Sequence, residues 1–218
     1  MSSDLQKLGG ISALIEAALY VTGFGLFLTV LDPSGYEGHV QKVAFLADNQ
    51  VALYIGNLLI YVVFGVVLVV LALALHARLK DGSPAIMQAA TAFGLIWAGL
   101  VIASGMIANI GNSTVVGLIS ENQDQAVLLW LTISTVQEAL GGGNEIVGGL
   151  WVLLLSWAAL LTDKLPKLLN YIGVLVGLAG ILTVIPEFDV LMDVFGLGQI
   201  VWFAWLGIVM LREKPSAT

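Results

Sequence analysis

Long apolar stretches separated by short polar segments dominate this chain. Six of them are long enough to cross a hydrocarbon core about 30 Å thick as helices, at about 1.5 Å per residue. They run from about Gly9–Leu31, Val51–Ala77, Gln88–Ile119, Ala126–Leu161, Leu168–Ile185 and Val194–Leu211. We therefore expect an all-α integral membrane bundle of six transmembrane helices that forms a single domain over residues 1–218.

Two details of the pattern favour helices over strands. Runs such as Val66–Leu75 are apolar at every position, whereas a barrel strand alternates apolar and polar residues. Proline interrupts a helix, and no proline lies inside a predicted span. The five prolines fall at or just beyond the ends of the spans: Pro33, Pro84, Pro166, Pro186 and Pro215.

Two segments need a separate interpretation. The stretch Ala126–Leu161 is too long for one straight crossing, so it either projects beyond the membrane by several turns or breaks at Gly141–Gly143. A projecting helix is the simpler account. The longest connection, Asp32–Gln50, contains a segment, His39–Ala47, that can form a short interfacial helix.

Composition supports a lipid environment. The chain is 59% hydrophobic and only 11% charged, whereas about 25% of residues are charged in a typical soluble domain. It has no cysteine, which excludes disulfides and thiolate metal sites. The net charge is −7 and the few basic residues are dispersed, so membrane lipids are expected partners and nucleic acid is not.

The basic residues predict an orientation. Seven of the eight lie on one side of a six-span layout, and only Lys42 lies on the other. The seven are Lys7, Arg78, Lys80, Lys164, Lys167, Arg212 and Lys214. Because basic loops stay in the cytoplasm, this side and both termini are predicted to be cytoplasmic.

A polar segment with repeated glycines lies in the outer half of the fourth stretch. Gln137–Gly149 reads QEALGGGNEIVGG, and helical spacing places Glu138, Gly142, Glu145 and Gly149 on one stripe. Glu145 comes out about 24 Å above the cytoplasmic end of its helix. Such a stripe serves either helix packing with a structural polar network, or a ligand, proton or cation site; both interpretations remain open.

The ligand-site interpretation makes Glu145 the ligand-facing carboxylate and Glu138 the residue at the mouth. The other candidate ligand-binding residues are Asn144, Asn109, Asn112 and Trp151. If they face inward, Trp97, Trp151 and Trp202 form an aromatic floor near mid-membrane; ordinary packing or lipid contact is the alternative. Glu16 and Gln199 are secondary buried polar candidates, and Glu16 lies only about 12 Å above the start of its helix, apart from Glu145.

The sequence points away from enzymes and metal sites. His39 and His76 are predicted on opposite sides of the membrane, so they cannot share a metal or haem, and no cofactor is expected. No metalloprotease, hydrolase or nucleotide-binding motif is present. A carboxylate-only active site at Glu138 and Glu145 is the remaining enzymatic alternative.

Three stretches carry a family resemblance: Gly142–Leu160 (GGNEIVGGLWVLLLSWAAL), Leu165–Leu182 (LPKLLNYIGVLVGLAGIL) and Gly198–Arg212 (GQIVWFAWLGIVMLR). In these the chain resembles the DUF4386-type bacterial multi-pass membrane proteins of unknown function. The resemblance implies a helical membrane bundle from a bacterial source, and together with the one-sided basic residues it predicts the bacterial cytoplasmic (inner) membrane. It carries no activity or site residue to transfer.

The leading hypothesis is a membrane protein that binds or transports a small amphipathic or cationic ligand through an outward-facing acidic pocket. The alternatives are a non-catalytic accessory or scaffold subunit of a membrane complex or homo-oligomer, and an intramembrane carboxylate-dependent enzyme. The pocket hypothesis requires Glu145 to face the bundle interior beside a cavity.

Overall fold

The computed structural model describes residues 3–142, 145–188 and 190–212, and these residues form helices without any strand. The elements are α1 (Ser3–Thr29), α2 (His39–Asp48), α3 (Gln50–Asn57), η1 (Leu58–Val63), α4 (Phe64–Leu79), α5 (Pro84–Ile119), α6 (Gln123–Gln137), η2 (Glu138–Gly142), α7 (Glu145–Thr162), α8 (Lys167–Leu182), η3 (Pro186–Phe188) and α9 (Val190–Arg212). η1 and η2 are π-helical, and η3 is a 3-10 turn. The prediction of an all-α protein is confirmed.

Helix length and composition identify a membrane-embedded protein. Five stretches are long and apolar enough to cross a bilayer: Ser3–Thr29, Gln50–Leu79, Pro84–Ile119, Gln123–Thr162 and Val190–Arg212. The predicted span at Leu168–Ile185 corresponds to α8. Its 16 residues extend about 24 Å, which is shorter than a hydrocarbon core about 30 Å thick. Five spans are therefore supported by length, and the sixth stays a prediction.

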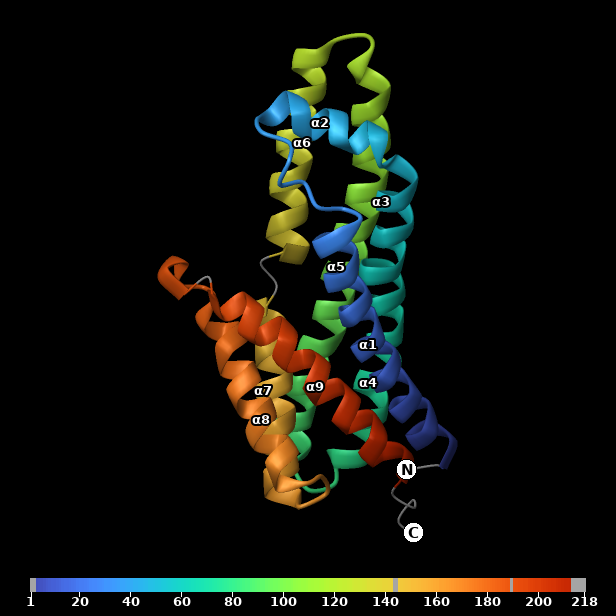
Figure 1. Ribbon diagram of the computed structural model, residues 1–218. Helices are drawn as coiled ribbons and strands as arrows, with labels where there is room; N and C mark the ends of the chain where they lie inside the picture. Colours follow the sequence, from blue (N-terminus) through green and yellow to red (C-terminus); the bar gives the residue numbers. More distant parts are fainter. Residues whose placement is uncertain (1–2, 143–144, 189, 213–218) are drawn as a thin grey trace.

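The predicted fourth stretch, Ala126–Leu161, shows both an irregular segment and a projection beyond the main bundle. Its regular α-helix ends at Gln137, and a π-helical turn covers Glu138–Gly142 before α7 begins at Glu145. Gly143, the last residue of the suspected break, lies outside the described residues. In Figure 1 α6 also extends well beyond the level of α7, α8 and α9. The expected short helix at His39–Ala47 is present as α2.

The helices form two parts with separate cores. The main bundle consists of α1, α4, the first half of α5, α7, α8 and α9, and both termini lie at its far end (Figure 1). The distal projection consists of α2, α3, α6 and the second half of α5. Its small core contains Leu31, Val43, Phe45, Leu46, Leu53, Val115 and Ala126. α5 has 36 residues and spans about 54 Å, so it connects the two parts.

Glycines bring two pairs of helices into close contact. A Cβ built on Gly149 of α7 would lie 2.6 Å from the carbonyl oxygen of Gly177 on α8, and one built on Gly177 would lie 2.8 Å from that of Gly149. On α1, a Cβ at Gly10 would lie 3.2 Å from the carbonyl oxygen of Gly207 on α9. Small residues at such crossings let backbones approach, which maximises van der Waals contact where lipid offers no hydrophobic driving force.

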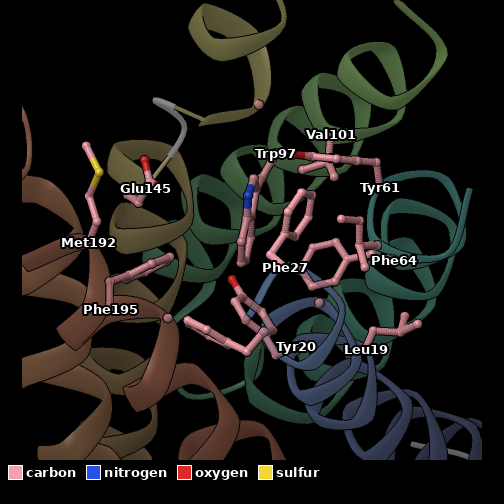
Figure 2. Close-up of a pocket in the computed structure, with 15 residues that line it drawn as sticks. Leu19, Tyr20, Phe27, Tyr61, Phe64, Trp97, Val101, Glu145, Met192 and Phe195 are labelled. Atoms are coloured by element: carbon pink, nitrogen blue, oxygen red, sulfur yellow. The ribbon is translucent and has the colours of Figure 1, made fainter. Parts of the chain in front are cut away.

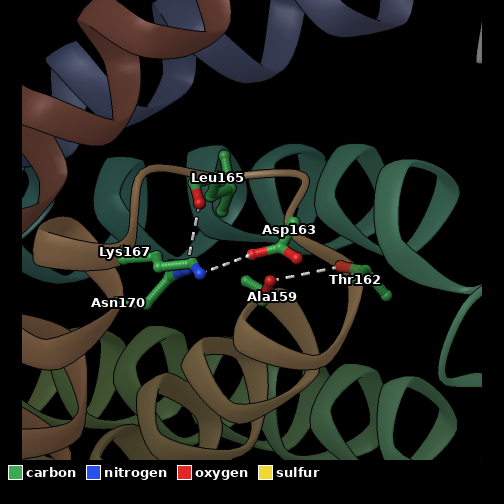
Figure 3. Close-up of polar contacts among 6 residues, drawn as sticks. All are labelled: Ala159, Thr162, Asp163, Leu165, Lys167 and Asn170. Carbon is green, nitrogen blue, oxygen red and sulfur yellow. Dashed lines mark hydrogen bonds and ion pairs between the residues drawn. The ribbon is translucent and has the colours of Figure 1, made fainter.

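The turn between α7 and α8 is held by local polar contacts (Figure 3). Asn170 Nδ2 donates a hydrogen bond to the Leu165 carbonyl at 3.2 Å, which ties the first turn of α8 to the loop. Lys167 Nζ lies 3.5 Å from the carboxylate of Asp163, but both side chains are exposed, so this ion pair adds little stability. Asp163 has a positive φ of 50°, a conformation that aspartate tolerates better than most residues.

Two loops are joined at the end of the bundle that holds the termini. Arg78 donates a hydrogen bond to the Lys164 carbonyl at 2.8 Å, and Lys164 donates one to the Arg78 carbonyl at 3.0 Å. These reciprocal bonds connect the end of α4 to the α7–α8 turn. Basic residues from both loops thus gather at one end of the main bundle, as their spacing predicted.

The glycine contact between α7 and α8 gives a stability prediction. We expect Gly149→Ala to lower the free energy of unfolding by about 1–3 kcal/mol, because the new methyl group would overlap the backbone of α8. Gly99→Ala is the matched control, since its Cβ would meet nothing within 4 Å. Denaturant unfolding in detergent micelles, followed by tryptophan fluorescence, measures the free energy of unfolding of both variants. Equal stabilities would contradict a close backbone contact at Gly149.

Candidate functional site

A cavity of about 330 Å³ lies within the main bundle, among residues of α1, η1, α4, α5, η2, α7 and α9. Its walls are mainly aromatic (Figure 2). The aromatic lining residues are Tyr20, Phe24, Phe27, Tyr61, Phe64, Trp97 and Phe195. We call this space the aromatic cavity. The lining residues Phe27 and Met192 remain 42% exposed, which gives the cavity access to the surface where α1 and α9 separate.

Among the described residues, Glu145 is the only acidic or basic side chain in the lining. It is the first described residue of α7. Its Oε2 atom is buried and has no hydrogen-bond partner among the described residues. The carboxylate therefore keeps an acceptor for a group that enters the cavity, and Figure 2 shows it across from Tyr61 and Phe64.

Both π-helical segments reach the aromatic cavity. η1 contributes Ile60 and Tyr61, and η2 contributes Gly141. The hydroxyl of Ser104 on α5 donates a hydrogen bond at 3.1 Å to the carbonyl of Gln137, directly before η2. Gly141 packs directly on Ser104, leaving no room for a Cβ. π-helical turns occur often at functional sites, because the extra residue redirects neighbouring side chains.

The tryptophans predicted to form an aromatic floor do point inward. Trp97, Trp151 and Trp202 are at most 2% exposed, and neighbouring ring centroids lie 5.7 and 5.8 Å apart. Trp97 lines the aromatic cavity, whereas Trp151 lies behind it and is absent from the lining. Trp151 therefore supports the wall rather than facing the space. Edge-to-face and tilted pairs of this kind contribute about 0.5–1.5 kcal/mol each beyond simple burial.

The predicted asparagine neighbours of Glu145 lie elsewhere. Asn57 Nδ2 donates a hydrogen bond to Asn109 Oδ1 at 3.1 Å, and Asn109 Nδ2 donates one to the Tyr54 carbonyl at 3.2 Å. Asn109 and Asn112 line a second cavity of about 250 Å³ between α3 and α5. The structure therefore does not bring these residues to the aromatic cavity, and Asn109 instead joins α3 to α5.

The other predicted site residues divide into an exposed, an undescribed and a buried group. Glu138 is exposed and does not line the aromatic cavity, and Asn144 lies outside the described residues. Glu16 and Gln199 are fully buried, as their depth suggested. Neither carboxylate oxygen of Glu16 and neither amide atom of Gln199 has a hydrogen-bond partner among the described residues.

Sequence reasoning missed most of the aromatic lining. Tyr20, Phe24 and Phe27 follow one another at spacings of four and three residues on α1, which puts them on one helix face. That spacing was available in the sequence and identifies the wall that α1 contributes. Tyr61 and Phe195 had no comparable signal, because a π-helical turn and the crossing of α9 decide where they point.

Comparisons with known proteins identify a family but no function. A family model described as a domain of unknown function (DUF4386) matches residues 8–209, which confirms the expected resemblance. No curated protein and no solved structure matches the chain. Among the described residues, no group of three or more His, Asp or Glu side chains is placed to hold a metal ion.

The asparagine pair gives a prediction that separates structure from ligand binding. We expect Asn109→Ala to lower the free energy of unfolding by about 1 kcal/mol, because it leaves the buried amide of Asn57 unpaired. Asn112→Ala, one helical turn away and partly exposed, is expected to change it by less than about 0.5 kcal/mol. Denaturant unfolding in micelles compares the two variants, and equal losses would refute a specific structural role for Asn109.

Proposed function

The chain belongs to the DUF4386 family, and we propose that it is a membrane protein that binds a small amphipathic cation in the aromatic cavity, with Glu145 as the counter-charge. One observation carries this proposal. In the part of the chain that the structure describes, seven aromatic rings and one carboxylate line this cavity, and one buried oxygen of that carboxylate has no hydrogen-bond partner.

The chemistry of the lining selects for positive charge combined with apolar surface. The faces of Trp, Tyr and Phe rings attract cations, by about 0.5–1 kcal/mol at exposed sites and about 2 kcal/mol when water is excluded. The apolar part of a ligand gains from leaving water for the aromatic walls. A volume of about 330 Å³ is at the lower end of the usual range for small-molecule sites, which favours a compact ligand.

The position of Glu145 strengthens the preference for a cation. A neutral ligand would leave the carboxylate without a counter-charge, and an anion would be repelled by it. Glu145 is joined in the lining by the hydroxyl-bearing rings of Tyr20 and Tyr61, which supply polar groups that orient a ligand. The lining thus combines a few polar groups with a large apolar surface.

A quaternary ammonium probe tests the proposal. Benzyltrimethylammonium is expected to bind purified protein in nanodiscs, and Glu145→Gln to weaken its affinity about tenfold, because the counter-charge is lost. Glu138→Gln removes an exposed carboxylate outside the cavity and should have no effect. Neopentylbenzene, the uncharged carbon analogue, should bind both variants and the natural protein equally. Calorimetry that finds the same cation affinity with and without the Glu145 carboxylate would refute the assignment.

A pair of glycine variants tests whether the probe binds in the aromatic cavity. Gly23 lines the cavity and its Cβ would only touch Ile60, at 3.4 Å, so Gly23→Leu should fill the space and abolish binding without moving backbone. Gly25→Leu, two residues away on α1, meets open space and should bind normally. Binding that survives Gly23→Leu would locate the probe elsewhere.

We also propose six crossings of the bacterial inner membrane, with α8 as the fifth and both termini in the cytoplasm. Support comes from the basic residues at one end of the bundle, where both termini lie (Figure 1). Because the chain has no cysteine, single-cysteine variants report the sides directly. In intact spheroplasts an impermeant maleimide should label Lys42→Cys and Glu187→Cys, and Lys167→Cys only after permeabilisation. Equal labelling at positions 167 and 187 would show that α8 does not cross.

A further inference from the structure

Glu16 is a buried acid that the proposed binding site does not use. It lies near the middle of α1, it is 0% exposed, and neither of its carboxylate oxygens has a hydrogen-bond partner among the described residues. It lines neither the aromatic cavity nor the second cavity. An ionisable side chain inside a membrane span is costly, and such residues commonly mark ion or proton pathways.

The helix packed against Glu16 carries a second unpaired polar side chain. α1 and α9 run antiparallel, since Gly10 meets Gly207 near one end and Phe24 meets Gly196 near the other. Between these contacts Leu14 meets Gly207 and Tyr20 meets Phe203, so Glu16 lies opposite residues 203–207, about one turn of α9 from Gln199. Both amide atoms of Gln199 are buried and also lack partners among the described residues. Two uncompensated polar side chains therefore lie on the two packed helices, about one turn apart.

The charged groups around Glu16 are distant or of the same sign. On α1 the nearest ionisable group is Tyr20, one turn away, and beyond it Tyr61 of η1 and Glu145 of α7 line the aromatic cavity. The ionisable residues described on α4 and α9 lie near helix ends. They are His76 and Arg78 on α4, and Asp193 and Arg212 on α9.

These surroundings suit a proton better than any other ligand. A carboxylate buried without a partner costs several kcal/mol, whereas the neutral acid avoids this cost. A metal ion or a small molecule would need space and further donors, but a proton needs neither. Glu16 also lies next to the aromatic cavity, because Tyr20, about 6 Å further along α1, is in its lining.

We propose that Glu16 is a proton-binding site coupled to the aromatic cavity, so that a cation in the cavity and a proton on Glu16 oppose each other. The coupling rests on the proposed cation binding. A cation one helical turn away stabilises the negative charge on Glu16 across a medium of low dielectric constant. The protonated protein then takes up the cation and releases one proton to water, and the return of the proton expels the cation.

Two measurements on the full-length protein in nanodiscs test this. Infrared spectroscopy at neutral pH should show a protonated carboxylic acid band that disappears in Glu16→Gln and persists in Glu145→Gln. Binding of benzyltrimethylammonium in weakly buffered solution should release about one proton, and its affinity should rise with pH by up to tenfold per unit. In Glu16→Gln the release should vanish, and the affinity should stay at the value of the natural protein at low pH.

The outcomes distinguish the two proposals. Proton release that persists in Glu16→Gln but is lost in Glu145→Gln would assign the proton to Glu145 and overturn the inference. Cation binding without proton release would overturn the coupling. If the probe does not bind at all, the proposed function fails and the coupling fails with it, while the infrared band still decides whether Glu16 holds a proton. Glu16→Leu, an apolar replacement suited to a buried site, repeats the test if Glu16→Gln does not fold.

Discussion

The close approach of paired helices is the contact on which the rest of this structure depends. In lipid, helices gain little from the hydrophobic effect on associating, so van der Waals contact across small residues must hold them together. α7 meets α8 at Gly149 and Gly177, and α1 meets α9 at Gly10 and Gly207. Between these pairs the bulky residues gather, and Trp97, which packs against Trp151, forms a wall of the aromatic cavity.

The same constraint explains where the polar groups are found. Backbone groups in a membrane must be satisfied internally, and departures from regular helix are tolerated mainly where they face protein or a cavity. The two π-helical segments obey this rule, since both contribute to the aromatic cavity and Ser104 satisfies a carbonyl beside one of them. Gly141 of the second segment and Glu145 of α7 both line the cavity, so the irregular backbone and the carboxylate occupy one site.

Much of the fold could be predicted because its signals are local. The span Ala126–Leu161 was recognised from apolar length, and α2 from its place in a long loop, within a few residues of their observed ends. The candidate site was predicted less well. Glu145 and the three tryptophans were singled out by their depth along each helix, and the structure shows that the tryptophans face inward. Depth does not report rotation about the helix axis, which is why Asn109 was grouped with Glu145 although it faces α3.

The sequence by itself determined that this is a helical membrane protein, roughly where its helices run, and that Glu16, Gln199 and Glu145 lie within them. These properties follow from hydrophobic length and the cost of polar groups in lipid, which each segment carries alone. Only the tertiary structure decided that Glu145 faces a space between helices, that Asn109 bonds to Asn57, and that aromatic residues from α1, η1 and α9 share one lining. The reason is that helix rotation and crossing depend on contacts between segments far apart in the chain, such as the glycine pairs that bring α7 to α8 and α1 to α9.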